Sequence, residues 1–390
     1  MQLRAPEVRE AEAPGSVRRV AAAVPSHPVG VRKLRAQAVR LQKGKFNRPE
    51  LDALRFFAFL CVFIHHIPVM NPQWDLLGFV GQFGVSIFFI LSAYLLFTIL
   101  LRERKEHGHI RWGAFAVRRI LRIWPLYFAA VGIAFLIGLH WKSVALSPRG
   151  LHYLLALSGN ILFMRFGWIA LPSTIGVLWS VSVEEQFYLV LPLLARFAPK
   201  ATNVIIVCTI VFGVAYAILL HLQLAGRGWP SAWANSFVQF QFFGAGMLIA
   251  LHGQYRPPAH RPGVRIGLLV TGIVLWLFVM ELPVSLGFLF LLVGSVAIFY
   301  SILGVDLHIP QGFIYLGRIS YGLYVFHPFW MWAVFASNGT EIHYFSAHRW
   351  EGAAVVLTAT ILTAAISYEL MEKPILGLKR RFEVVKTRQA

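Results

Sequence analysis

The chain has 390 residues, of which 57% are hydrophobic and only 14% are charged. Soluble domains carry about 25% charged residues, so the composition excludes an ordinary soluble protein and indicates a polytopic membrane protein with room for roughly ten helices. The formal net charge of +19 does not indicate a nucleic-acid partner, because the basic residues lie in a tail and in loops beside apolar runs. That pattern is typical of cytoplasmic loops facing anionic lipid headgroups. We therefore expect a lipid bilayer, and no nucleic acid, as partner.

The two ends of the chain differ from the rest in being basic. Residues 1–48 contain eleven Lys or Arg and three Glu. No apolar segment precedes Leu51, so we do not expect a cleavable signal peptide. We predict a disordered cytoplasmic tail over 1–47, a membrane domain over 48–378 and a second basic cytoplasmic tail over 379–390.

Apolar segments follow one another between these tails, separated by proline, glycine and charged residues. The segment Leu151–Met164 is too short for a span, so we expect a re-entrant or interfacial helix there. The predicted fold class is all-α, a polytopic membrane protein of about ten transmembrane helices plus this short helix. The predicted spans cover about 52–70, 79–101, 116–140, 178–197, 203–223, 237–252, 265–282, 285–303, 314–336 and 351–371.

Basic loops set the expected orientation. The loop 102–112, the loop containing Arg256, Arg261 and Arg265, and the tail after Lys373 are rich in basic residues, which marks them as cytoplasmic. Ten spans place these loops and both termini on the cytoplasmic side of the plasma membrane, which is the inner membrane of a cell with two. Eleven spans would move one terminus outside.

The segment Leu51–His66 has ionisable residues at both ends of an apolar helix. Asp52 and Arg55 are spaced i,i+3, and at 1.5 Å per residue His66 lies about 16 Å beyond Arg55, roughly half a hydrocarbon core. Ionisable groups inside a membrane are costly and are candidates for a functional site. His66 could take a proton from a hydroxyl near neutral pH, or it could be a hydrogen-bonded histidine of a helix bundle. His65, about 100° round the helix, is expected to support it.

Arginines gather at the start of the third predicted helix. Arg119 and Arg122 are spaced i,i+3, and Arg118 lies alongside. Such a cluster suits a polyanionic ligand, because guanidinium binds phosphate bidentately, and Arg55 could contact a phosphate from its own helix. The alternatives are ordinary positive-inside anchoring of the cluster and a simple ion pair between Asp52 and Arg55.

The predicted helix 178–197 carries Ser180, Glu184 and Tyr188 on one face, at i,i+4 spacing. A carboxylate within an apolar helix must be paired or protonated. We expect Glu184 to orient the histidine at position 66 or to bind an acceptor. Glu185 is the second candidate, and solvation at the membrane interface is the alternative for both.

A late apolar helix carries His327 near its middle and Arg318 one turn into its cytoplasmic end. We expect both to line or support the functional site. A hydrogen-bonded core histidine is the alternative for His327. Motifs for metal or nucleotide chemistry are missing: only two cysteines occur, Cys61 and Cys208, and the sequence contains no GxGxxG, P-loop or HExxH. We expect neither a metal nor a permanently bound cofactor.

Six segments, in this order, resemble the acyltransferase 3 family of integral membrane acyltransferases. The first is similar to the family's Leu-Asp-Gly-Leu-Arg start, with Ala53 replacing the Gly. The family has a histidine eleven residues after this Arg, and the same spacing from Arg55 selects His66 here. Ser86 stands where an Asp is common. The resemblance covers about 48–378, in the segments LDALRFFAFLCVFIHH (51–66), GVSIFFILSAYLL (84–96), RRILRIWPLYF (118–128), LWSVSVEEQFYL (178–189), LGRISYGLYVFHPF (316–329) and SYELMEKP (367–374).

The resemblance implies an enzyme that moves an acyl group, most often acetyl, from cytosolic acyl-CoA to a hydroxyl of a carbohydrate-containing acceptor, and so a role in polysaccharide modification. Acetyl-CoA would be a co-substrate. Direct transfer and transfer through an acyl-histidine both fit. The residues expected to act are His66 and Glu184 in catalysis, Arg55, Arg119, Arg122 and Arg118 on the donor phosphates, and Asp52, His65, Ser180, Glu185, Tyr188, Arg318 and His327 as substrate contacts or support.

Two other classes of protein are open. In a transporter, His66, Glu184 and His327 would relay protons or bind a solute, although the inverted repeat common in transporters is not visible. A non-catalytic membrane component of a glycan assembly complex is the second. Transfer of label from a thioester to an acceptor separates the enzyme from both.

Overall fold

The regular structure is helical, as the apolar periodicity predicts, and no strand occurs in the part of the chain that the structure describes. The all-α fold class is therefore confirmed. The predicted tail 1–47 and most of the predicted tail 379–390 lie outside the described residues. The computed structural model describes residues 48–68, 76–196, 202–223, 232–253, 260–279, 281–305, 308–335, 345 and 348–382.

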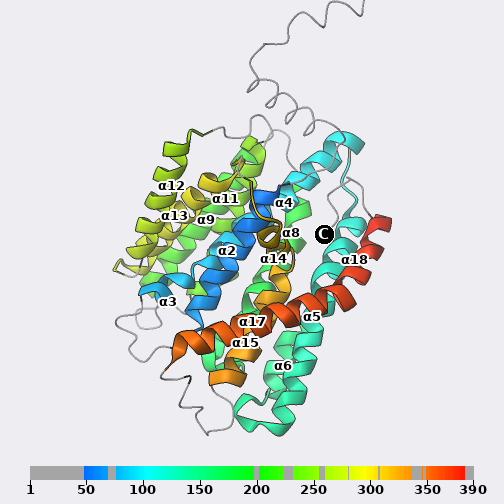
Figure 1. The fold of residues 1–390 in the computed structure, drawn as a ribbon. Helices are drawn as coiled ribbons and strands as arrows, with labels where there is room; N and C mark the ends of the chain where they lie inside the picture. Colours follow the sequence, from blue (N-terminus) through cyan, green and yellow to red (C-terminus); the bar gives the residue numbers. More distant parts are fainter. Residues whose placement is uncertain are drawn as a thin grey trace, which may run out of the picture. The chain divides into compact units, whose positions relative to one another are not determined.

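Figure 1 shows how these helices follow one another. Short 3₁₀ turns occur at Lys142–Val144, Trp168–Ala170 and Arg380–Phe382. The helices are α2 (Pro49–His65), α3 (Leu76–Gly81), α4 (Gly84–His107), α5 (Trp112–His140), α6 (Pro148–Leu155), α7 (Gly159–Phe166), α8 (Leu178–Arg196), α9 (Thr202–Gln223), α11 (Ser236–Gly253), α12 (Pro262–Leu277), α13 (Val284–Ile302), α14 (Gln311–Arg318), α15 (Ser320–Phe335), α17 (Arg349–Ser367), the π-helical turn η5 (Tyr368–Glu372) and α18 (Lys373–Lys379).

Membrane-spanning length is reached by four helical stretches within the described ranges: Gly78–His107, Trp112–His140, Ser285–Ile302 and Arg349–Lys379. Two shorter apolar helices, Ile206–Ile218 and Pro262–Leu277, accompany them. The chain is thus a helical membrane protein, and the predicted number of ten spans is not confirmed. The first predicted helix is shorter than expected, because α2 has 17 residues and ends at His65 instead of continuing to residue 70.

The region predicted as one short helix, Leu151–Met164, is two helices of eight residues each, α6 and α7. The break falls at Leu157, whose φ of 52° is left-handed and ends an α-helix. A second difference occurs in the predicted span 314–336, which is divided at Ile319 into α14 and α15.

Close packing holds α2 between its neighbours α4, α14 and α15. A Cβ atom at Gly317 of α14 would lie 1.9 Å from the carbonyl oxygen of Asp52, and one at Gly84 of α4 would lie 2.4 Å from that of Ala58. Both distances are far below a van der Waals contact, so only glycine allows these helices to approach α2. The backbone of α2 is therefore in close contact with both α4 and α14.

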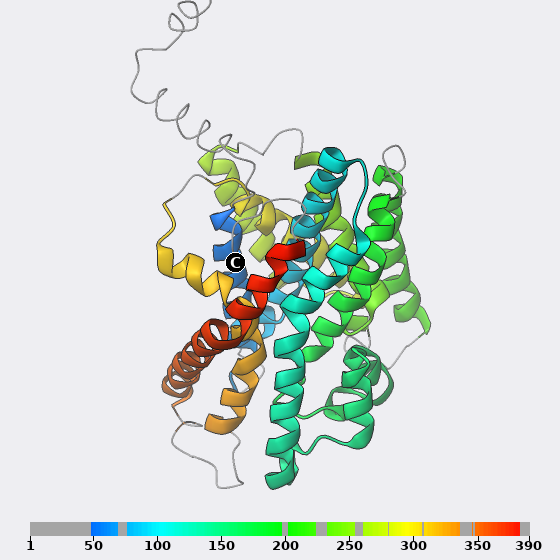
Figure 2. The ribbon, with the colours of Figure 1, turned by 90° about the vertical axis from the view of Figure 1, so that its right-hand side faces the viewer.

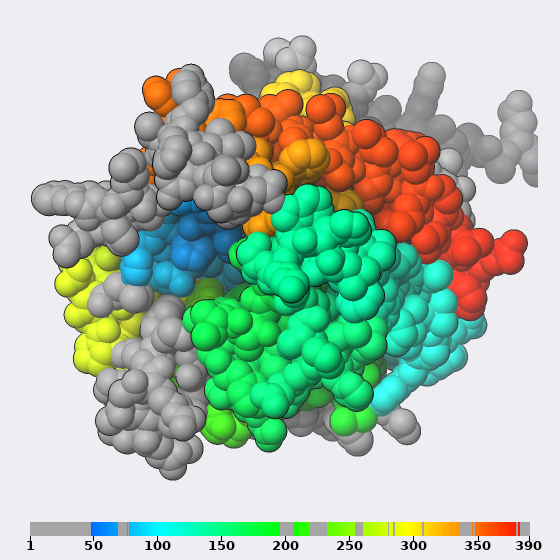
Figure 3. Space-filling view, turned by 90° about the horizontal axis from the view of Figure 1, so that it is seen from below, coloured from blue at the N-terminus to red at the C-terminus, as the bar shows by residue number. Residues whose placement is uncertain are grey.

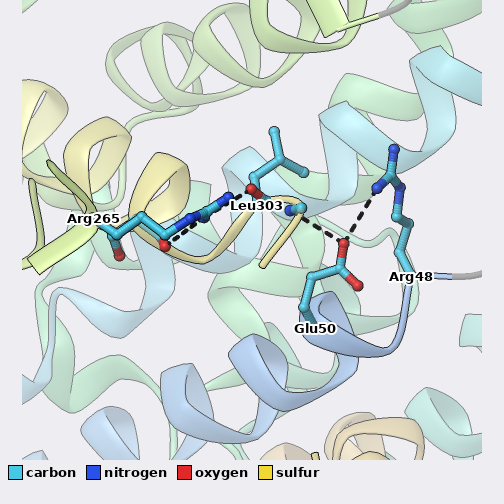
Figure 4. Close-up of polar contacts among 6 residues, drawn as sticks. Arg48, Glu50, Arg265 and Leu303 are labelled. Carbon is cyan, nitrogen blue, oxygen red and sulfur yellow. Dashed lines mark hydrogen bonds and ion pairs between the residues drawn. The ribbon is translucent and has the colours of Figure 1, made fainter. Parts of the chain in front are cut away.

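The first turn of α2 is also fixed by polar contacts, which Figure 4 shows. The carboxylate of Glu50 is 4% exposed and accepts hydrogen bonds from the backbone N–H of Gly304 at 3.2 Å and from Arg48 at 3.4 Å. Arg265 donates to the carbonyl of Leu303 at 3.0 Å and so caps the end of α13. These contacts tie the start of α2 to the end of α13.

Candidate active site

Two histidines from distant parts of the sequence meet where α2 ends. Nδ1 of His66 lies 2.8 Å from the carbonyl of Val62 and 3.4 Å from Nε2 of His327, and the ring centroids are 5.0 Å apart. His327 is completely buried on α15, and its Nδ1 lies 3.3 Å from the carbonyl of Leu323. We call His66 and His327 the histidine pair.

The hydrogen bonds of the histidine pair assign its tautomers. A carbonyl oxygen only accepts, so Nδ1 carries the proton in each neutral ring. The lone pair of His327 Nε2 then faces the N–H of His66. The lone pair of His66 is left on Nε2, where it is able to accept a proton from a hydroxyl.

His65 packs its ring edge-on against that of His66, with the ring centroids 5.0 Å apart. Its Nδ1 lies 2.8 Å from the carbonyl of Gly78, and its side chain is exposed. It therefore fastens α3 to α2, while His66 meets the interior. Viewed from below, the blue surface of α2 and α3 is visible beside the teal of α5 and α6 (Figure 3), so this end of α2 reaches that face of the molecule.

The polar face of α8 begins beside the histidine pair. The hydroxyl of Ser180 lies 2.7 Å from that of Tyr324, whose ring centroid is 5.8 Å from that of His327. One turn further along α8, Glu184 accepts a short hydrogen bond from Ser92 of α4. The expected role of Glu184, to orient His66 or to bind an acceptor, stays a prediction: no hydrogen bond joins the two among the described residues, and the side chain that meets Nδ1 of His66 is His327.

Tyr188 continues the same face of α8 towards the arginines. The guanidinium of Arg119 lies 6.0 Å from the centroid of the Tyr188 ring, and Tyr188 also interacts electrostatically with Arg55. The i,i+4 series Ser180, Glu184 and Tyr188 therefore extends from the histidine pair to the arginines, about 12 Å along the helix axis.

Four arginines from α2, α5 and α14 form what we call the arginine cluster: Arg55, Arg119, Arg122 and Arg318. Arg122 lies near both Arg55 and Arg119, and Arg122 and Arg318 both lie near Tyr368. Arg55 makes an ion pair with Asp52 at 2.8 Å and interacts electrostatically with Arg122. The Nε atoms of Arg119 and Arg318 are buried and have no hydrogen-bond partner among the described residues. Unused donors on fixed guanidinium groups suit a ligand with several phosphate oxygens.

Arg118 lies near Arg119 but is held by partners of its own. Its guanidinium makes a buried ion pair with Glu103 at 3.2 Å and donates to the carbonyl of Phe382 at 2.7 Å. The second oxygen of Glu103 accepts from the backbone N–H of Arg111 at 2.7 Å. Sequence spacing placed Arg118 with its neighbours, whereas the structure engages it in joining α4, α5 and the C-terminal turn.

Glu185 lies on the adjacent face of α8 and accepts from Nε1 of Trp124 at 3.0 Å. Its other carboxylate oxygen is buried and accepts no hydrogen bond within the part of the chain that the structure describes. Ser86, the residue that stands where the resembling family has Asp, lies in a separate network and is 2.7 Å from the hydroxyl of Ser295. Its position thus gives it a packing role on α4.

One ionisable residue of this region was missed by the sequence analysis. Glu372 lies on η5, is 8% exposed and interacts electrostatically with Arg122. The segment SYELMEKP carries the signal, but it contains two glutamates, Glu369 and Glu372, and helical spacing does not choose between them.

The fold and these contacts define a class: a helical membrane protein whose ionisable side chains meet inside a helix bundle, imidazoles at one end and guanidinium groups at the other. Residues 48–371 match the acyltransferase domain family, acyltransferase 3. The chain belongs to this family, which confirms the resemblance.

Curated relatives match a shorter part. The chain is 31% identical over 156 residues, 37% of its length, to the peptidoglycan O-acetyltransferase OatA of Listeria monocytogenes, 23% of which is covered. It is 32% identical over 157 residues, again 37% of its length, to YrhL of Bacillus subtilis, provisionally named as a peptidoglycan O-acetyltransferase, 23% of which is covered. The matched part spans about a quarter of each relative. No solved structure is significantly similar to the chain.

Proposed function

We propose that the protein is a membrane O-acyltransferase that moves an acetyl group from cytosolic acetyl-CoA to a hydroxyl of a carbohydrate-containing acceptor, such as a polysaccharide or a lipid-linked glycan. The observation that carries the proposal is the polar face of α8, which joins the histidine pair to the arginine cluster. The names of the relatives, peptidoglycan O-acetyltransferases, support the acetyl group and the carbohydrate acceptor.

The arginine cluster binds the phosphates of the donor in this proposal. Arg119 and Arg318 have buried Nε donors without partners, and Arg55 and Arg122 add positive charge. The pantetheine arm then runs along the α8 face, and the thioester lies beside His66, about 16 Å from Arg55 along α2. We place the arginine cluster and both termini on the cytoplasmic side of the plasma membrane, in agreement with the basic loop 102–112.

The reaction uses the lone pair on Nε2 of His66. As the acceptor hydroxyl oxygen attacks the thioester carbonyl carbon, this nitrogen takes the hydroxyl proton. The C–S bond of the tetrahedral intermediate then breaks. The CoA sulfur leaves as a thiolate and takes the proton from the imidazolium, which restores neutral His66 and gives an acetyl ester and free CoA. A two-step route, in which the imidazole first accepts the acetyl group, uses the same residues.

Three further residues hold this arrangement without touching the reacting atoms. His327 accepts the N–H of His66 and fixes the direction of its lone pair. Tyr324 lies beside His327 and contacts Ser180. Glu184, held by Ser92, lies on the face of α8 between Ser180 and Tyr188.

The test uses inside-out membrane vesicles from expressing cells, supplied with acetyl-CoA labelled in the acetyl group. Free CoA and label in the glycan and lipid fractions are followed at matched protein levels. We expect His66→Ala to lose transfer by about a hundredfold or more, the usual contribution of a general base. The matched control is His252→Ala, an exposed histidine at the end of α11, which should transfer like the wild type.

The outcomes identify the acceptor class, distinguish the one-step from the two-step route and test the role of His66. The labelled fraction names the acceptor class, and label retained on the protein without acceptor, but absent in His66→Ala, would indicate the two-step route. Equal transfer by wild type and His66→Ala would remove His66 from catalysis. No transfer by either, with acceptor pools intact and other acyl-CoAs tried, would favour the transporter.

A further inference from the structure

Glu372 is a buried carboxylate that the mechanism above does not use. It ends η5, the π-helical turn between α17 and α18, and Figure 2 shows α18 in red crossing α5. π-Helical turns are rare in proteins, and those that occur are often found at functional sites. Among the described residues, the hydrogen bond to Glu372 comes from the Ser367 hydroxyl alone, at 3.5 Å, which is the long limit of such a bond. A carboxylate in this position has little compensation for its burial.

Arg122 is the matching cation on α5, which packs against η5 and α18. It makes no hydrogen bond and no ion pair with any residue that the structure describes. Glu372 and Arg122 interact electrostatically, yet no carboxylate oxygen of Glu372 lies within ion-pair distance of the Arg122 guanidinium. The neighbouring Arg55, by contrast, is closed on Asp52 at 2.8 Å.

An open pair of this kind has two consequences for a phosphate ligand. In the low dielectric of a protein interior, the attraction between Arg122 and Glu372 is strong enough to matter at a separation beyond direct contact. A donor phosphate on Arg122 therefore competes with the carboxylate. When the ligand leaves, the carboxylate is available to the guanidinium, which lowers the penalty of leaving a buried charge unpaired.

We propose that Glu372 is the counter-anion that replaces the CoA phosphates on Arg122, so that it weakens CoA binding and speeds release of the product. It is a positioning residue, because it contacts neither the thioester nor the acceptor. The inference rests on the proposed function, since it requires CoA as the ligand of the arginine cluster.

The experiment is equilibrium binding of labelled CoA to the purified full chain in lipid nanodiscs, without acceptor. Glu372→Gln removes the charge and keeps the size, so we expect CoA to bind about threefold to tenfold more tightly, the size of a screened charge interaction. During turnover, KM for acetyl-CoA and kcat should both fall, because product release becomes slower. A residue with only a structural role would not tighten CoA binding.

Glu369→Gln is the matched control, with the same substitution on the same turn. Glu369 is exposed and paired with the exposed Lys373, so the affinity for CoA should not change. Glu372→Met removes the same charge without leaving a buried amide unpaired, and it decides the question if Glu372→Gln does not fold. In an Arg122→Gln background, Glu372→Gln should have no further effect on CoA binding.

Unchanged or weaker CoA binding by a folded Glu372→Gln or Glu372→Met protein would overturn the inference and leave the proposed function standing. The same applies if the tightening persists in the Arg122→Gln background, because the carboxylate then acts through another group. Failure of the wild type itself to bind CoA would overturn the donor assigned under the proposed function, and this inference with it.

Discussion

At the scale of single residues, the two ring nitrogens of His66 have different tasks. One holds the ring in place by hydrogen bonds, and the other is left for proton transfer. Nδ1 of His66 is engaged by Val62 and His327, so only Nε2 is available for proton transfer. Holding one nitrogen by hydrogen bonds is the common way in which a protein fixes the tautomer and direction of a histidine. The buried His327 supplies part of that hold.

Replacement of His327 by alanine should lower kcat by about tenfold to a hundredfold and leave KM for acetyl-CoA nearly unchanged. The reason is that His66 loses its orientation while the arginine cluster, which we propose binds the donor, is untouched. His327→Gln, whose side-chain oxygen accepts a hydrogen bond, should recover part of the loss. Steady-state transfer in vesicles measures both constants, and a large rise in KM with kcat unchanged would contradict the positioning role.

Replacement of Arg119 by alanine should raise KM for acetyl-CoA by about tenfold or more, because a charge-assisted hydrogen bond to phosphate is lost. The control is Arg149→Ala, which removes an exposed arginine lying 4.8 Å over the ring of Phe166. Donor titrations measure the effect. Equal KM values for the two variants would show that the arginine cluster does not bind the donor.

Spacing within one helix predicted the residue-scale features that depend on that helix alone. The ion pair of Asp52 with Arg55 and the shared face of Ser180 and Glu184 follow directly from helical geometry. The contact between His66 and His327 does not, because 261 positions separate them and helical spacing alone does not determine which faces of two helices meet. For the same reason, the partner of Glu184 on α4 was not predicted.

At the scale of elements, α2 is the helix against which the site is assembled. It packs against α4, α14 and α15, and its close approach to α14 depends on Gly317. The division of 314–336 into α14 and α15 was missed for the same reason as the split of 151–164: apolar residues lie on both sides of each break, so composition marks the whole stretch and not the turn within it. The tertiary contacts select the position of each turn.

Gly317→Ala should destabilise the protein by about 1–3 kcal/mol, the usual effect of overpacking, because the new Cβ would meet the Asp52 carbonyl at 1.9 Å. KM for acetyl-CoA should rise as well, since Arg55 moves with α2. Gly312→Ala is the control on the same helix, where a Cβ meets nothing within 4 Å. Thermal unfolding in detergent measures both, and equal midpoints would contradict the packing.

At the scale of the whole molecule, the ion pair of Glu103 with Arg118 connects the interior of the sequence to its C-terminal end. Arg118 also donates to the carbonyl of Phe382, 264 positions away. The sequence placed this arginine with the phosphate-binding group because charge density looks the same for a ligand site and for an internal ion pair. Only the position of the buried partner, Glu103, distinguishes the two.

Glu103→Ala should therefore destabilise the protein by about 3–5 kcal/mol, because a buried guanidinium is left without its counter-charge. Glu106→Ala, an exposed residue on the same helix, should leave the unfolding midpoint unchanged. Replacing both Glu103 and Arg118 by leucine should restore most of the stability. If the double variant were as unstable as Glu103→Ala, unpaired charge would not be the cause.

The close packing of α2 against α4 and α14 has a consequence for the choice of acyl donor. Arg55 and His66 lie on one helix, so the helical rise fixes their separation, and the close approach of α4 at Gly84 and of α14 at Gly317 fixes where α2 packs. The helix thus fixes the distance between Arg55, which we propose binds a phosphate, and His66, which we propose acts as the base. If the arginine cluster binds the donor phosphates as we propose, a thioester whose phosphates and carbonyl carbon match that distance should react, whereas one with a shorter or longer arm should not reach His66. Selectivity for the carrier then comes from length, independently of the acyl group it bears.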